Sequence, residues 1–304
     1  MKGAPDREGA GVGRLLLIAL PFTWLAVFFL LPFLIVLKLS FSESALAQPP
    51  YLPIVEWVEE AGELYLTVRL RVQNYLTLLS DGLYLAAFAS SLRIAATATV
   101  LALLVAFPIA LGMARCRPQV RPFLLLAVML PFWTSFLIRV YAWMGILKDD
   151  GFLNALLLWL GLIDRPLVVL NTETAVLIGI VYSYLPFMIL PIFANLEKHD
   201  PALLEAAVDL GCRPWKAFWR ITVPLARPGI LAGCFLVFIP AVGEFVIPDL
   251  LGGADTLMIG RTLWLEFFTN RDWPLASAVA ISMLLVLVVP IVLFQRHQAL
   301  ERLR

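Results

Sequence analysis

Side chains that could do covalent chemistry are few in this chain of 304 residues, and they do not cluster. The two histidines, His199 and His297, stand about a hundred residues apart, with no acidic or cysteine partner at metal-ligand spacing. The cysteines, Cys116, Cys212 and Cys234, show neither a disulfide framework nor a zinc spacing. No Gly-x-x-x-x-Gly-Lys-Ser/Thr segment is present. The sequence therefore predicts no enzyme, no metal site and no nucleotide-binding loop of its own.

One carboxylate stands out because it interrupts a long apolar run. Glu244 lies within the run 229–251, and an ionised carboxylate inside a membrane span costs at least about 2.5 kcal/mol. It therefore needs a partner. One candidate is a cation that crosses the membrane, which could also make cation–π contacts with aromatic side chains of this chain, namely Trp133, Tyr141, Tyr184 and Phe245.

The other candidate partner of Glu244 is Arg139. Both residues lie about fifteen residues into spans that run outward, so at a rise of about 1.5 Å per residue they reach a similar depth. A permanent Arg139–Glu244 ion pair is therefore as consistent with the sequence as a contact with a transported cation. Asp249, after Pro248 at the outer end of the same run, is either a first contact for that cation or a solvated surface carboxylate.

The elements that must position these residues are membrane helices. The chain is 61% hydrophobic and only 15% charged, its mean hydropathy is +0.89, and its charges stand between long apolar runs. A helix needs about 20 apolar residues to cross the hydrocarbon core. The sequence predicts an all-α integral membrane protein with six transmembrane helices, at 15–39, 85–114, 123–147, 175–196, 229–251 and 275–294. The first run is too long for a signal-peptide core and is interpreted as an uncleaved helix.

The orientation follows from the lysines and arginines, which gather in alternate loops. By the positive-inside rule, both termini of this multi-pass chain are cytoplasmic. The net charge of +1 comes without a basic patch, so no nucleic acid partner is expected. The outer loops are acidic, which either concentrates a cation near the mouth of a pathway or only reflects the exclusion of basic residues from that side.

Two loops are long enough for structure of their own. The outer segment 42–84 alternates strictly between apolar and polar residues over 63–72, which predicts a small strand or hairpin. This segment either caps the helices or docks an external partner. The cytoplasmic loop 198–229 predicts two short helices, at 201–210 and 214–222.

The helix signals of the cytoplasmic loop are specific. Asp200 is a good N-cap, Pro201 suits the first helical position, and Gly211 can end the first helix in the left-handed conformation. Pro224 and Pro228 are expected to end the second helix and turn the chain back towards the membrane.

In this loop the residues Glu205-Ala206-Ala207, Gly211, Ile221 and Val223-Pro224 resemble the EAA loop of bacterial ATP-binding-cassette (ABC) importer permeases. The resemblance implies a type I ABC importer permease fold and a place in a bacterial inner membrane. It also implies that the first helix is a coupling helix, which docks in a groove of a cytoplasmic ATPase through residues of its last two turns, namely Glu205, Ala206, Ala207, Asp209 and Gly211. The alternative is an ordinary cytoplasmic linker with a capped helix.

Other segments are similar to the polyamine importer permeases, and most of all to the first permease subunit of putrescine systems. These are 133–143, 243–253, 258–261 and 270–274. The resemblance implies that the chain forms half of a pathway for putrescine or spermidine. The implied partners are a second homologous permease, two ATPase subunits that bind ATP and Mg²⁺, a periplasmic polyamine-binding protein and membrane lipid, with no cofactor in this chain. The competing hypothesis is a stand-alone secondary transporter or channel that uses Glu244 as its cation site.

Overall fold

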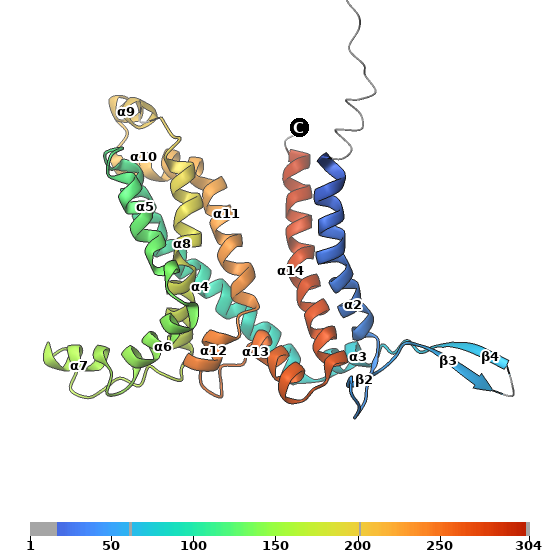
Figure 1. The fold of residues 1–304 in the computed structure, drawn as a ribbon. Helices are drawn as coiled ribbons and strands as arrows, with labels where there is room; N and C mark the ends of the chain where they lie inside the picture. Colours follow the sequence, from blue (N-terminus) through green and yellow to red (C-terminus); the bar gives the residue numbers. More distant parts are fainter. Residues whose placement is uncertain (1–16, 61–62, 201, 302–304) are drawn as a thin grey trace, which may run out of the picture. The chain divides into compact units, whose positions relative to one another are not determined.

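The computed structural model describes residues 17–60, 63–200 and 202–301, which divide into two compact units (Figure 1). The terminal unit comprises residues 1–81 and 263–304, and the central unit comprises residues 82–262. Each unit has its own packing.

The terminal unit is built on two helices that lie side by side. The helix Leu17–Ser40 contains the π-helical turn η1 (Ala26–Leu30) and α2 (Leu31–Ser40), and it packs along α14 (Trp273–Glu301). A short helix, α3 (Gln73–Ser80), is held at the end of α2, because the Asn74 side-chain amide donates to the carbonyls of Ser40 and Ser42, at 2.9 Å each. The π-helical turn η4 (Leu265–Thr269) precedes α14.

Two small antiparallel ladders separate α2 from α3. Strand β1 (Glu43–Ser44) pairs with β2 (Tyr51–Leu52), and β3 (Val55–Glu60) pairs with β4 (Glu63–Val68), with Val55 opposite Val68 and Glu60 opposite Glu63. The predicted strand or hairpin is confirmed. The strand ends at Val68 rather than at residue 72, because the chain then enters α3.

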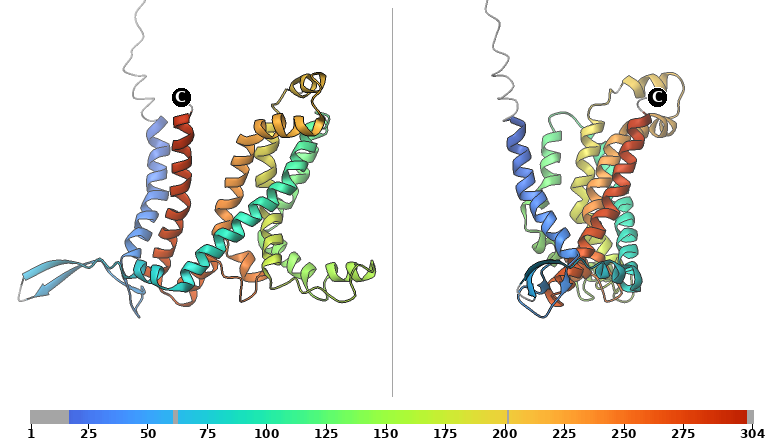
Figure 2. Two further views of the ribbon diagram at one scale, coloured as in Figure 1. Left: turned by 180° about the vertical axis from the view of Figure 1, so that it is seen from behind. Right: turned by 90° about the vertical axis from the view of Figure 1, so that its right-hand side faces the viewer.

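The central unit has a core of three long helices, α4 (Gly82–Arg115), α8 (Glu173–Leu196) and α11 (Val223–Val242), which lie side by side in Figures 1 and 2. Small residues spaced three or four apart line the buried face of α4, and each is fully buried: Ala87, Ser91, Ala95, Ala98, Ala102, Ala106 and Ala110. Such a stripe lets helix backbones approach closely, which is the main source of packing energy between membrane helices.

Helices α8 and α11 meet equally closely. A Cβ atom at Gly233 would lie 2.7 Å from the Met188 sulfur, and one at Gly229 would lie 2.7 Å from the carbonyl oxygen of Pro191. Only glycine fits this crossing, so the sequence fixes which faces of α8 and α11 touch. Helix α8 also continues through both of its internal prolines, Pro186 and Pro191.

Shorter elements surround this core. They are α5 (Arg121–Met129), the 3₁₀ turn η2 (Leu130–Trp133), α6 (Phe136–Leu147), α7 (Phe152–Trp159), α9 (Ala202–Asp209), α10 (Pro214–Ala217), the π-helical turn η3 (Phe218–Thr222), α12 (Val246–Leu251) and α13 (Ile259–Trp264). Helix α6 packs against α8 and α12.

The described residues contain four helices that are long and apolar enough to cross a membrane: Leu17–Ser40, Gly82–Arg115, Glu173–Leu196 and Pro214–Val242. A fifth span results if the pair Arg121–Trp133 and Phe136–Trp159 is counted as one. The sixth predicted span falls on α14, whose described apolar part, Trp273–Val288, is shorter than a full span. The count of six therefore stays a prediction.

The third predicted span, 123–147, is not one straight helix. Its two halves are bent by 87° at Thr134 and Ser135, which both have extended backbone. Pro131 lies in the 3₁₀ turn before the bend, and its carbonyl accepts a hydrogen bond of 2.8 Å from the Thr134 hydroxyl. Both halves are apolar, so hydropathy alone does not reveal the bend.

The fifth predicted span, 229–251, does not coincide with a single helix. The helix begins at Pro214 and ends at Val242, and a break at Gly243 separates it from α12. Pro224 and Pro228 do not turn the chain back. The π-helical turn η3 directly precedes α11, and the helix continues through Pro224 and Pro228.

Candidate functional site

The first candidate site is the loop 198–229, which the sequence predicts to be cytoplasmic and whose helix α9 lies at one end of the central unit (Figure 1). The Asp200 carboxylate accepts a hydrogen bond from the Ala202 N–H at 2.9 Å, as expected of an N-cap. At the other end, Gly211 has φ of +78°, and the Cys212 N–H donates to the Ala207 carbonyl at 2.9 Å. The predicted helix is confirmed within one residue at each end, apart from Pro201, which lies outside the described residues.

Helix α9 presents most of its surface to solvent. None of its residues is buried, and Glu205, Ala206 and Asp209 are exposed, whereas Ala207 is half-buried. Leu210, just after the helix, has an exposed fraction of 88%. Two apolar residues of α9 itself, Leu203 and Val208, are also exposed, at 50% and 52%.

The base of the loop is anchored to the helices. The Arg121 guanidinium donates to the carbonyl of Ala114 at 2.7 Å and to the carbonyl of Cys116 at 3.1 Å, and it forms an ion pair of 3.1 Å with Glu197 at the end of α8. A pocket of about 300 Å³ separates α9 from the helices, and Leu111, Leu196, Leu203 and Leu225 are among its lining residues. The loop is therefore tied to the central unit at its root and open around α9.

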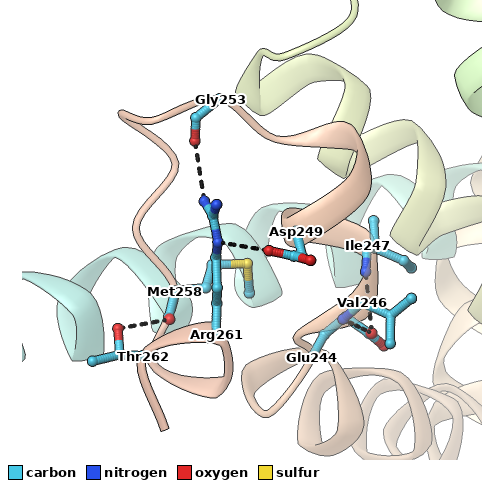
Figure 3. Close-up of polar contacts among 8 residues, drawn as sticks. All are labelled: Glu244, Val246, Ile247, Asp249, Gly253, Met258, Arg261 and Thr262. Atoms are coloured by element: carbon cyan, nitrogen blue, oxygen red, sulfur yellow. Dashed lines mark hydrogen bonds and ion pairs between the residues drawn. The ribbon is translucent and has the colours of Figure 1, made fainter. Parts of the chain in front are cut away.

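The second candidate site surrounds Glu244. The structure places this residue in the break between α11 and α12, not inside a helix. One carboxylate oxygen accepts the N–H groups of Val246 and Ile247, at 3.1 and 3.4 Å, which are the first two residues of α12 (Figure 3). The other oxygen accepts a hydrogen bond from the Tyr184 hydroxyl of α8. Glu244 is only 7% exposed.

These contacts reveal a role that the sequence did not suggest. Glu244 caps the amino terminus of α12, where the free N–H groups and the helix dipole favour a negative charge. All three donors are neutral, so they solvate the carboxylate but do not neutralise it. The buried charge still favours a cation in the adjoining space.

That space is a pocket of about 530 Å³. Its lining residues come from η2, α6, α8, α11, the break after α11 and the start of α12: Phe132, Phe136, Arg139, Ser183, Tyr184, Phe187, Pro240, Gly243, Glu244, Phe245 and Val246. Of the predicted pathway residues, the structure brings Glu244, Tyr184 and Phe245 together here. Trp133 and Tyr141 are 75% and 55% exposed and do not line the pocket.

The structure contains no Arg139–Glu244 ion pair, although both side chains are described and both line the pocket. The Arg139 guanidinium lies over the Phe132 ring, 4.8 Å from its centroid, and 5.7 Å from that of Phe136. Its Nε and Nη1 atoms are buried without a hydrogen-bond partner. The depth argument correctly placed the two residues at one pocket, but the helix breaks let each side chain find other contacts.

Sequence reasoning missed several lining residues, among them Phe132, Phe136, Ser183 and Phe187. One signal was available for Phe136, which precedes Arg139 by three residues and so shares its helix face. Phe132 lies across the bend, so helical spacing could not have placed its ring beside the guanidinium.

Asp249 lies on α12 outside this pocket. Its carboxylate forms an ion pair of 3.1 Å with Arg261 of α13, whose guanidinium also donates to the carbonyl of Gly253 at 3.4 Å (Figure 3). Asp249 therefore helps to fix the loop between α12 and α13. Among the described residues, no group of three or more His, Cys, Asp or Glu side chains could hold a metal ion.

Comparison with known proteins identifies the class of this molecule. The family described as "Binding-protein-dependent transport system inner membrane component" matches residues 98–300, which is more than half of the chain. The chain belongs to this family. Members of the inner membrane component family are transport subunits, and this chain is accordingly a multi-pass protein of the bacterial inner membrane.

Two relatives of this inner membrane component are similar over nearly their whole length. The spermidine/putrescine transport system permease protein PotB of Haemophilus influenzae is 40% identical over 283 residues, which cover 93% of each chain. The protein of the same name from Escherichia coli K12 is 39% identical over 277 residues, covering 91% of this chain and 94% of its own. The predicted resemblance to the polyamine permeases is confirmed.

Solved structures support the fold. A bacterial ABC transporter for import of the acidic polysaccharide alginate matches with a TM-score of 0.66 at 20% identity, covering 97% of this chain and 99% of its own. The alginate transporter in complex with its alginate-bound periplasmic protein matches with a TM-score of 0.69 at 19% identity, covering 97% of each chain. The ABC importer permease fold predicted from the EAA loop is confirmed.

Proposed function

We propose that this chain is the permease subunit of an ATP-driven, binding-protein-dependent importer of polyamines, with spermidine and putrescine as the substrates to test first. The observation that carries the proposal is the identity of 39–40% over more than nine tenths of the chain with permeases named for these two substrates. The chain supplies one wall of the pathway, and a second homologous permease supplies the other.

The Glu244 pocket supports a cationic substrate. An ammonium group is a donor that needs acceptors and negative charge, and Glu244 offers both at the edge of an aromatic pocket. Ring faces such as those of Tyr184 and Phe187 add cation–π attraction of about 0.5–2 kcal/mol each when well placed. In this proposal Glu244, Tyr184 and Phe245 contact the substrate, while Trp133, Tyr141 and Asp249 lie along the route to the pocket.

Helix α9 supports coupling to a separate ATPase. We place Glu205, Ala206, Ala207, Asp209 and Gly211 in contact with one of two ATPase subunits, which bind ATP and Mg²⁺. Small alanines allow the partner to approach the helix backbone closely, and the left-handed Gly211 directs the chain sharply away from the contact. A periplasmic polyamine-binding protein delivers the substrate on the opposite side.

The test is uptake by the assembled transporter in proteoliposomes that contain ATP. We expect spermidine or putrescine uptake that requires the binding protein and is abolished by vanadate. The competing function is a secondary transporter or channel that works alone, favoured by the isolated acidic pocket. Uptake by this chain alone that responds to ionophores and not to ATP would overturn the proposed function.

A further inference from the structure

We infer that the Arg139 guanidinium and an ammonium group of the substrate compete for the Glu244 carboxylate, so that Arg139 is a built-in displacing cation that promotes release. The inference rests on the proposed function, since it needs a cationic substrate at Glu244. It assigns to Arg139 a role in release rather than in holding the fold together.

Unsatisfied polar atoms concentrate at this pocket. In the described part of the chain, five buried side-chain polar atoms lack a hydrogen-bond partner, and three of them, Arg139 Nε, Arg139 Nη1 and Ser183 Oγ, belong to residues that line it. Buried polar groups are normally paired, because an unpaired one loses its hydration without compensation. The pocket is therefore built for a polar occupant or for a second arrangement of its own side chains.

The hydrogen-bonding chemistry of the guanidinium and of an ammonium distinguishes a polar occupant from a second arrangement of the pocket's own side chains. A guanidinium has five N–H donors and no acceptor, and an ammonium likewise only donates. A polyamine in the pocket could satisfy Glu244 but never Arg139, which it would instead repel. Glu244 carries the one carboxylate among the lining residues, so it is the natural acceptor for both cations.

The surroundings of Arg139 provide a resting place for the displaced guanidinium. It lies over the Phe132 ring at 4.8 Å from the centroid, close to the Phe136 ring. Arginine stacks well on aromatic faces because it is weakly hydrated for a cation. The structure thus shows the arrangement in which the guanidinium rests on an aromatic ring and is not paired with Glu244.

Both competitors are attached to breaks in the helices. Arg139 follows the bend at Thr134 and Ser135 by one turn, and Glu244 lies between α11 and α12. A small change at either break alters the distance between the two charges without repacking of the α4, α8 and α11 core. Movement of α6 towards α12 would bring the guanidinium to Glu244 and expel the ammonium.

Exchange of one cation for another has a useful consequence. During release the guanidinium takes the place of the departing ammonium at the carboxylate, so the substrate leaves without exposing an uncompensated buried charge. A transport site must bind weakly enough to let its substrate go.

The experiment uses the complete transporter in proteoliposomes with ATP trapped inside and increasing concentrations of unlabelled spermidine in the lumen. Lumenal spermidine slows uptake by re-occupying the pocket. For Arg139→Gln we expect half-inhibition at about tenfold lower lumenal spermidine, because the competing charge is lost. Arg139→Lys keeps a cation and should stay within about twofold of the parent protein.

A second variant, Phe132→Leu, is expected to shift the half-inhibiting concentration of lumenal spermidine in the opposite direction. Phe132→Leu removes the ring under the guanidinium, so Arg139 should favour Glu244 and half-inhibition should need about three- to fivefold more lumenal spermidine. A purely structural role of Arg139 gives no such opposite shifts. Arg93→Gln is the matched control, because Arg93 forms an exposed ion pair with Glu173 on the same unit.

The outcomes separate the two proposals. If the parent transporter takes up no polyamine, the proposed function fails. If it does so and Arg139→Gln shows the parent's lumenal inhibition, the inference fails while the function stands. An Arg139→Lys protein that assembles normally but behaves like Arg139→Gln would also overturn it, since the positive charge would then not be what matters.

Discussion

At the scale of single residues, Glu244 combines two tasks that are usually separate. It caps α12 through the N–H groups of Val246 and Ile247, and it offers a buried negative charge to the pocket. The first task needs only an acceptor oxygen, whereas the second needs a charge. A substitution that keeps the oxygen and removes the charge therefore separates them.

Glu244→Gln is that substitution. Its amide oxygen can still accept from the α12 N–H groups, so the complex should assemble with the parent's yield and thermal stability. Polyamine uptake should fall by at least about tenfold, because a neutral amide attracts an ammonium far less than a carboxylate does. The measurement is the initial rate of uptake, normalised to assembled complex. Full activity would remove Glu244 from the pathway.

The Glu244→Arg/Arg139→Glu swap provides the control. A purely structural ion pair would be restored by the swap. In this structure Arg at position 244 cannot accept the two backbone N–H groups, so the swap should not recover uptake. Recovery to near the parent's rate would contradict the capping role.

The sequence alone could single out Glu244 but not its partners. A charged residue in an apolar run is visible in any hydropathy profile. Its actual donors are backbone N–H groups, and these become available only because α11 stops at Val242, next to a glycine, within a run that stays apolar. Neither hydropathy nor spacing reports where a helix breaks inside such a run.

At the scale of elements, local sequence signals were enough to predict both ends of helix α9. Asp200 and Gly211 mark the two ends of the helix, and the structure uses both as expected. The same reasoning failed for Pro224 and Pro228, since tertiary packing carries the helix from Pro214 to Val242 through both prolines. Proline predicts a missing hydrogen bond, and a π-helical turn next to it can absorb that loss.

Gly211 gives a prediction at this scale. A Cβ at this position meets no atom within 4 Å, so space is not limiting, but φ of +78° is strained for most side chains. Gly211→Val should raise the free energy of this turn by about 1–2 kcal/mol and lower substrate-stimulated ATP hydrolysis severalfold. Gly211→Asn, which tolerates the left-handed region, should retain most of the stimulation. Equal activity of both variants would show that the backbone conformation is unimportant for coupling.

At the scale of the whole molecule, apolar side chains are exposed in two different settings. Those along the long helices suit lipid, whereas Leu210 lies in the loop 198–229 and is 88% exposed. Hydropathy predicted the long helices because it measures how apolar each stretch of the sequence is. It did not predict the bend of 87° in the third run, because both halves are equally apolar.

Leu210 gives the prediction for the assembly. Leu210→Asp should abolish co-isolation of the ATPase with the permease, because a charge replaces an apolar contact, while insertion in the membrane stays unchanged. The matched control is Leu46→Asp, at a leucine of the terminal unit that is even more exposed than Leu210. Retained ATPase after Leu210→Asp would place the docking surface away from α9.

The alanine stripe of α4 has one more consequence. Alanine has no side-chain torsion, so the seam between α4, α8 and α11 forms without freezing any rotamers at those positions. Larger buried side chains, among them Met188, Ile192, Phe193 and Val237, fill the rest of this cluster. In the proposed transport cycle, this closely packed frame is expected to move less than the bend before α6 and the break at Glu244 before α12.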